Sequence, residues 1–117
     1  MKFLVTDDSK LARLSIIKSL KLYVKDSDIF QATNGLEALQ VMKEEKPDIV
    51  FLDLTMPVMD GYEALPKLLE INPQAKIVVV SADVQTQAQE RVIALGATMH
   101  MQKPINADKI QEILDVI

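Results

Sequence analysis

The chain has 117 residues, of which 49% are hydrophobic and 26% charged, with three glycines and no cysteine. This length fits one compact domain with its own core, and the composition excludes a disordered or fibrous protein. The lack of cysteine excludes disulfides and thiolate metal sites, and the net charge of -4 argues against nucleic acid as a direct partner.

The sequence shows no targeting or membrane signal. The apolar run from Phe3 to Val5 is too short for a signal peptide and leads directly into Asp7 and Asp8. No later apolar run reaches the length of a membrane span. We therefore expect a single cytoplasmic domain over residues 1–117, without membrane contact.

Short apolar segments alternate along the chain with segments of helical periodicity. The short segments are typical of strands and cover residues 2–5, 29–32, 49–52, 77–81 and 98–102. Between them, apolar residues three or four positions apart predict five helices with one buried face each. In chain order these faces are Leu11, Leu14, Ile17 and Leu20; Leu36, Leu39 and Met42; Leu65, Leu68 and Leu69; Val92 and Leu95; and Ile110, Ile113, Leu114 and Ile117.

Start and stop signals support these helices. Residues that favour a helix start precede four of the segments: Ser9, Asn34, Asp60 and Asn106. Residues that favour a helix end follow three of them: Pro47, Pro73 and Gly96. Pro66 conflicts with the third helix because it lacks a backbone donor, so that helix is expected either to begin late, near Leu65, or to be distorted.

Five strands alternating with five helices predict an α/β fold in which helices cover both faces of a parallel sheet. Central strands read as continuous apolar runs, which describes 2–5, 49–52 and 77–81 but not 29–32 or 98–102. With right-handed crossovers the strand order becomes 2-1-3-4-5, the doubly wound, flavodoxin-like arrangement. Ligands bind such sheets beyond the carboxyl ends of the first and third strands.

Polar residues stand at that edge. Asp7 and Asp8 follow the first strand, Asp53 the third and Lys103 the fifth, while Ser81 ends the fourth. Two carboxylates about 4 Å apart repel by roughly 4 kcal/mol at an effective dielectric near 20, so a cation is expected among them. Three carboxylates without cysteine favour Mg2+ over Zn2+. Singly, each residue has a structural explanation as a cap, a turn or a surface charge, so the prediction depends on their convergence.

A carboxylate beside a magnesium ion, an ammonium group and a hydroxyl suits phosphoryl transfer. This reaction mainly requires alignment and neutralisation of the transferred oxygens, which Lys103 and Ser81 can supply. Asp53 is the predicted nucleophile and would become an acyl phosphate. The chain contains no G-x-x-x-x-G-K and no G-x-G-x-x-G motif, so the phosphoryl donor is expected to be another molecule.

The segments TDDSKLAR, DLTMPVMDG, VSA, LGAT and KP stand in the order and spacing of the response-regulator receiver domain. Essentially the whole chain resembles this CheY-like family. The resemblance implies a two-component signalling protein that receives a phosphoryl group on Asp53 from a histidine kinase or a phosphotransfer protein. It further implies that the chain catalyses only its own phosphorylation and dephosphorylation.

Carried over by motif, the resemblance assigns roles around Asp53. It implies Asp8, Asp53 and the Thr55 backbone carbonyl as direct magnesium ligands, and Asp7 as a ligand through bound water. Ser81 is implied as the switch hydroxyl that meets the phosphoryl group. The remaining two residues are implied as the phosphate-contacting lysine and the proline, usually cis-bonded, that follows it: Lys103 and Pro104.

The resemblance also implies a protein output. Phosphorylation would reshape the face made by the fourth helix, fifth strand and fifth helix, where a downstream protein docks, as in chemotaxis. The chain is expected to stand alone as a monomer or weak dimer, or else to be a fragment of a longer response regulator.

Besides Pro66, three positions depart from the common pattern. His100 replaces the aromatic switch residue, and a half-exposed edge-strand imidazole is as good an interpretation as a switch. Thr55 and Asp83 occupy positions that tune the lifetime of the acyl phosphate in the family.

Two alternatives remain. A haloacid-dehalogenase-type phosphatase is disfavoured because Thr55 takes the place of its general acid and no cap insertion exists. A docking module that keeps the fold without being phosphorylated stays open.

Overall fold

The computed structural model describes residues 1–82 and 85–117. Within these ranges, strands and helices alternate as the periodicity predicts. The elements are β1 (Phe3–Thr6), α1 (Lys10–Leu20), η1 (Asp26–Asp28), β2 (Ile29–Ala32), α2 (Gly35–Glu45), β3 (Ile49–Leu52), α3 (Gly61–Ile71), β4 (Lys76–Ser81), α4 (Thr86–Ala94), β5 (Met99–Gln102) and α5 (Ala107–Val116).

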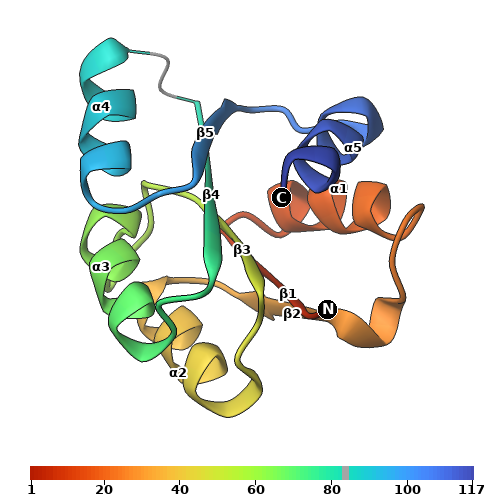
Figure 1. Cartoon of the computed structure of the whole chain (residues 1–117), viewed down its shortest axis with the longest axis horizontal. Helices are drawn as coiled ribbons and strands as arrows, with labels where there is room; N and C mark the ends of the chain where they lie inside the picture. The colour runs from red at the N-terminus through yellow and green to blue at the C-terminus, as the bar shows by residue number, and fades with distance from the viewer. Residues whose placement is uncertain (83–84) are drawn as a thin grey trace.

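The five strands form one parallel sheet in the order β2-β1-β3-β4-β5, which confirms the predicted flavodoxin-like topology (Figure 1). All residues of β1 and β3 are buried, and so is β4 after Lys76. The outer strands β2 and β5 are only partly buried, as their less apolar sequences predict.

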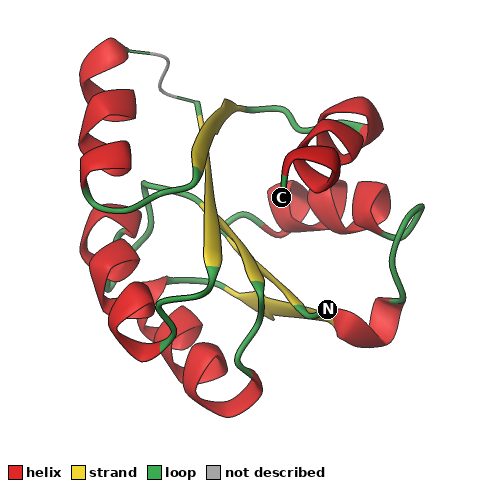
Figure 2. Ribbon diagram, in the orientation of Figure 1, coloured by secondary structure: helices red, strands yellow, loops and turns green. Residues whose placement is uncertain are grey.

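Helices cover both faces of the sheet. Figures 1 and 2 show α2, α3 and α4 on one face and α1 with α5 on the other. Because side chains alternate along a strand, Leu4 and Val79 point into the first layer while Val5 and Val80 point into the second. Both layers are continuous apolar clusters, so the sheet is a rigid base for groups at its edge.

The predicted helix starts are confirmed. The side chains of Ser9, Asn34, Asp60 and Asn106 each accept a hydrogen bond from the backbone N–H three residues later. The predicted ends hold as well, since α2 and α3 stop shortly before their prolines. Gly96 follows α4 with φ at 110°, in the region that favours glycine.

The predicted buried face of α1 is partly wrong. Leu11 and Leu14 are exposed at 82% and 44%, whereas Ile16 is buried together with Ile17 and Leu20. Apolar residues of α1 occupy more than one stripe of the helix, and only one stripe can face β1 and α5. Leu36 of α2 is likewise 55% exposed, contrary to prediction.

Pro66 lies inside α3, which begins at Gly61 and continues to Ile71. The alternative that the helix begins near Leu65 is therefore wrong. Since proline has no N–H, the carbonyl of Tyr62 has no intrahelical donor four residues ahead. The Asp60 cap and the burial of Ala64, Leu65 and Leu68 hold the helix together despite this loss.

No helix in the described part of the chain is both long and apolar enough to cross a lipid bilayer.

Candidate functional site

The candidate site lies at the carboxyl edge of the sheet, where backbone pairing continues past the strand ends. Asp7 N–H donates to the Ala32 carbonyl at 3.1 Å, and Asp53 N–H donates to the Thr6 carbonyl at 3.0 Å. Lys103 N–H donates to the Ser81 carbonyl at 2.9 Å. The backbones that carry the predicted site residues are thus fixed by the sheet.

Lys103 brings the acidic side chains together. Its Nζ lies 2.7 Å from Asp7 Oδ2 and 3.4 Å from Asp53 Oδ1. Asp7 and Asp53 are 1% and 7% exposed, so the acidic partner of each ion pair is buried, whereas the Lys103 side chain is 27% exposed. Burial by itself lowers the pKa of Lys103, but the hydrogen bond to Asp7 and the charge of Asp53 outweigh it and leave that pKa raised.

Neighbouring groups act in opposite directions on the pKa of the Asp53 carboxyl. Desolvation raises its pKa, and the nearby Asp7 charge raises it further, while Lys103 and the hydrogen bond from Leu54 N–H to Oδ1, at 2.9 Å, act in the opposite direction. The net result is a raised pKa. Because burial and the like charge of Asp7 disfavour the ionised form, further positive charge beside it would stabilise the Asp53 carboxylate.

Carboxylate oxygens of Asp7, Asp8 and Asp53 lie within 4.8 Å of one another. Three carboxylates stand around one Lys103 ammonium, so the cluster has an excess of negative charge that a divalent cation can neutralise. The donors are all oxygen, and Asp8 is exposed, so a hydrated ion can reach the cluster. These residues can therefore hold a divalent metal ion.

A cavity of about 400 Å³ opens beside Asp53. Its lining contains the predicted Ser81 and Lys103, and also Thr55 and Tyr62, which come from the loop after β3 and from the start of α3. Ser81 is 3% exposed and ends β4, so the cavity has a hydroxyl on a buried strand end. One residue each with a carboxylate, a hydroxyl and an ammonium group therefore lines this space: Asp53, Ser81 and Lys103.

Gly61 explains how α3 can approach the site so closely. Its N–H donates to the Leu54 carbonyl at 3.0 Å. A Cβ at this position would lie 2.2 Å from the Asp53 carbonyl oxygen, which no side chain allows. The glycine thus permits contact between the first turn of α3 and the backbone of Asp53.

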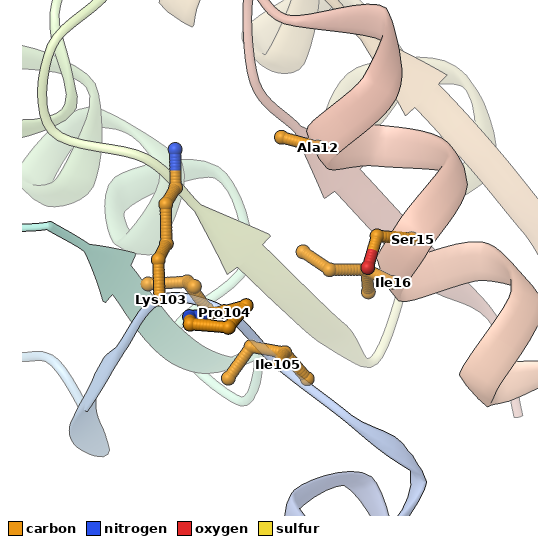
Figure 3. A pocket seen from close by; sticks show the side chains of 7 residues that line it. Ala12, Ser15, Ile16, Lys103, Pro104 and Ile105 are labelled. Carbon is orange, nitrogen blue, oxygen red and sulfur yellow. The ribbon is translucent and has the colours of Figure 1, made fainter.

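A separate cavity of about 120 Å³ lies between α1 and the segment after β5. Figure 3 shows Pro104 and Ile105 near Ala12 and Ile16, with the Lys103 side chain extending along one side. The lining is mostly apolar, so this space separates Lys103 from α1 and does not extend the acidic site. The Lys103–Pro104 peptide bond is cis, in agreement with the prediction.

His100 lies on β5 opposite Val79, so its side chain points into the layer of α2, α3 and α4. The residue is half-buried, and its Nε2 is buried without a hydrogen-bond partner among the described residues. Asp83, predicted to tune the acyl phosphate, lies outside the described residues.

Sequence reasoning assigned no role to two residues at the site. Arg13 donates from Nη1 to the Asp7 carbonyl at 2.8 Å and from Nε to Gln31 Oε1 at 3.0 Å, which ties α1 to β1 and β2. Tyr62 lines the Asp53 cavity. Its position directly after Gly61 was the available signal, because Gly61 contacts Asp53.

Comparisons with known proteins agree on one family. The family model of the response regulator receiver domain matches residues 3–115. The chemotaxis protein CheY of Listeria monocytogenes is 42% identical over 118 residues, covering 98% of this chain and 96% of that protein. A chain of the CheX-CheY-BeF3-Mg complex from Borrelia burgdorferi is similar with a TM-score of 0.81 and 29% identity, covering 99% of this chain and 88% of that one. A CheY-like receiver domain protein from Methanospirillum hungatei shares the fold with a TM-score of 0.89 at 22% identity, covering 98% of this chain and 90% of that one.

Proposed function

The chain belongs to the response regulator receiver domain family, and from this premise we propose that it accepts a phosphoryl group on Asp53 from a histidine kinase or a phosphotransfer protein. As a receiver domain of two-component systems it is a signalling protein. The observation that carries the proposal is the position of Lys103 Nζ, 2.7 Å from Asp7 and 3.4 Å from Asp53, at a cavity that Ser81 also lines.

In the proposed reaction a carboxylate oxygen of Asp53 attacks the phosphorus atom of the donor. The bond from phosphorus to the donor breaks, the donor keeps the electron pair, and Asp53 becomes an acyl phosphate. Lys103 would neutralise one transferred oxygen, and the Ser81 hydroxyl would donate a hydrogen bond to another. Later attack by water would return Asp53 to its carboxylate, so the chain would catalyse only its own modification and its reversal.

We propose Asp8, Asp53 and the Thr55 backbone carbonyl as direct ligands of Mg2+, which when bound would neutralise charge on the transferred oxygens. Asp7 would act through bound water. Its Oδ1 already accepts from Ser9 N–H at 2.9 Å and its Oδ2 contacts Lys103, which supports an indirect role. Magnesium fits better than zinc because the donors are oxygen only.

The output we propose is protein docking on the face formed by α4, β5 and α5, with a chemotaxis partner as the leading candidate. A bound phosphoryl group would draw Ser81 toward Asp53 and shift an existing equilibrium of that face. His100 lies on β5 within this face and is a candidate for transmitting the change. A monomer or weak dimer in the cytoplasm is the expected setting, as is typical of receiver domains.

The experiment is incubation with acetyl phosphate and Mg2+, followed by intact mass measurement. The wild type is expected to gain one phosphoryl group, and the gain should disappear in Asp53→Asn and on chelation of the metal. Asp115→Asn, an exposed acidic residue on α5, is the matched control and should be labelled like the wild type.

Two results would redirect the proposal. Equal labelling of Asp53→Asn would place the acceptor elsewhere. If the wild type takes no phosphoryl group and binds its partner with the same affinity with and without a phosphoryl mimic, the alternative of a docking module that works without phosphorylation is supported.

A further inference from the structure

Arg91 of α4 stacks on Tyr62 at the start of α3. The guanidinium carbon lies 3.8 Å from the centre of the tyrosine ring, within the range of a favourable cation–π contact. Arginine is well suited to this geometry because its planar guanidinium covers the ring face. The contact joins two helices that are separate along the chain.

Tyr62 belongs to the walls of two cavities. One is the cavity of about 400 Å³ that contains Asp53, Ser81 and Lys103. The other, of about 220 Å³, is lined by Arg91, Gln85, Gln87 and Ala88 of the α4 region in addition to Tyr62. Tyr62 therefore forms part of the boundary between the Asp53 carboxylate and α4.

The backbone of Tyr62 is fixed on the Asp53 side, whereas its ring is held from α4. Gly61, the preceding residue, packs against the Asp53 carbonyl, and Asp60 caps the helix with a 2.9 Å hydrogen bond from Glu63 N–H. Tyr62 is half-buried against the core, so part of its ring remains open to water. Arg91 covers a ring face that would otherwise be solvated.

We propose that Tyr62, held in place by Arg91, is a wall that keeps water from the acyl phosphate on Asp53 and thereby sets its lifetime. This inference rests on the proposed phosphorylation of Asp53. Arg91 acts in it as a positioning residue, because its contact is with the tyrosine ring and it does not line the Asp53 cavity.

The step that the wall controls is hydrolysis. The oxygen of a water molecule attacks phosphorus, the bond from phosphorus to the Asp53 oxygen breaks, and the carboxylate leaves with the electron pair. One proton of the water goes to solvent, the other stays on the phosphate, and inorganic hydrogen phosphate is released. No oxidant or further reactant is needed, so the rate depends on how readily water reaches the phosphoryl group.

The test starts from protein phosphorylated with acetyl phosphate and Mg2+, freed of the donor by desalting, and followed by intact mass over time. Arg91→Ala is expected to hydrolyse about two- to fivefold faster, the range that corresponds to an exposed cation–π contact. Tyr62→Ala should be at least as fast. Tyr62→Phe keeps the aromatic ring and should hydrolyse as slowly as the wild type. Glu90→Ala, at an exposed neighbouring position on α4, is the control for that helix and should also hydrolyse at the wild-type rate.

The double variant Tyr62→Ala/Arg91→Ala separates positioning from a general effect on the fold. If Arg91 acts through Tyr62, the double variant hydrolyses at the rate of Tyr62→Ala alone. Multiplication of the two single effects, or single variants that hydrolyse at the wild-type rate, overturns the inference while leaving Asp53 as the acceptor. Absence of labelling in the wild type overturns the proposed function together with this inference.

Discussion

Asp53 is less stable as a carboxylate in the folded protein than an aspartate is in water. Burial and the neighbouring Asp7 charge raise its pKa, and Lys103 only partly offsets them. Asp7 has both oxygens occupied, by Ser9 N–H and by Lys103. Of the two buried carboxylates, Asp53 is therefore the one whose ionised form a bound cation would stabilise most, and exposed Asp8 lies beside it in the same acidic cluster.

The raised pKa has a consequence for stability that Asp53→Asn can reveal in the absence of metal. The folded protein binds a proton at Asp53 more tightly than the unfolded chain does, so ionisation costs folding free energy as pH rises above the ordinary value of 3.8 and through the folded pKa. The variant should therefore have a larger free energy of unfolding than the wild type at pH 7. The difference should shrink as pH falls toward 3.8. Urea unfolding of both proteins at several pH values measures it, and a difference that stays constant with pH would contradict this explanation.

Thr6 carries a buried hydroxyl at the end of β1. The residue is 2% exposed, and Oγ1 has no hydrogen-bond partner in the described part of the chain. Thr6→Val removes this unsatisfied group at nearly constant volume and should raise the free energy of unfolding by about 1 kcal/mol. Thr6→Ala, which also leaves a void, should be destabilising in the same urea titration. A loss of stability in Thr6→Val would show that the hydroxyl has a role.

At the scale of the helices, burial patterns depend on where each helix meets the sheet. In α3 the predicted Leu65 and Leu68 are buried, because its apolar residues form one stripe. In α1 the apolar residues exceed one stripe, and Leu11 is exposed while Ile16 is buried. Periodicity therefore predicted that a helix exists better than it predicted which of several apolar positions faces the core.

Pro66→Ala tests the cost of the interrupted hydrogen bond in α3. Alanine restores an N–H that can donate to the Tyr62 carbonyl and removes the clash of the proline ring, and the missing bond and the clash together cost about 3 kcal/mol in a helix interior. The unfolded chain gains freedom worth about 1 kcal/mol, which offsets part of this. The expected net gain is about 2 kcal/mol in the free energy of unfolding. Glu70→Ala, exposed on the same helix, should change it by less than about 0.5 kcal/mol. Equal effects of the two substitutions would contradict this explanation.

At the scale of the whole molecule, the site exists only because β1, β3, β4 and β5 end at the same edge. The parallel order β2-β1-β3-β4-β5 places Asp7 and Asp53 on adjacent central strands and brings Lys103 back from β5. Binding a cation there couples segments that are distant along the chain. Metal binding and global folding should therefore be linked.

That linkage can be measured by thermal or urea unfolding with and without Mg2+. At a free concentration one hundred times the dissociation constant, the wild type should gain about 2.7 kcal/mol in the free energy of unfolding. Asp8→Asn should lose most of this gain, since Asp8 is a proposed direct ligand. Asp115→Asn, on the exposed side of α5, should keep it. A gain that survives in Asp8→Asn would place the metal elsewhere.

The sequence alone determined the five strands, the five α-helices, the strand order and the set of candidate site residues, but not the short helix η1. Apolar runs and helical spacing are local properties, and right-handed crossovers leave few topologies for them. Helix caps such as Asn34 and Asp60 can be predicted from sequence because they act within one helical turn. The motif resemblance implied the roles that we propose for Asp53, Ser81 and Lys103.

Only the tertiary structure decided which groups touch. Distances such as 2.7 Å from Lys103 to Asp7, the exposure of Leu11 and the stacking of Arg91 on Tyr62 depend on how helices seat against the sheet. These contacts join residues far apart along the chain, and local periodicity carries no information about them. Their energies arise from burial and from the mutual placement of charges, which exist only after the layers have packed.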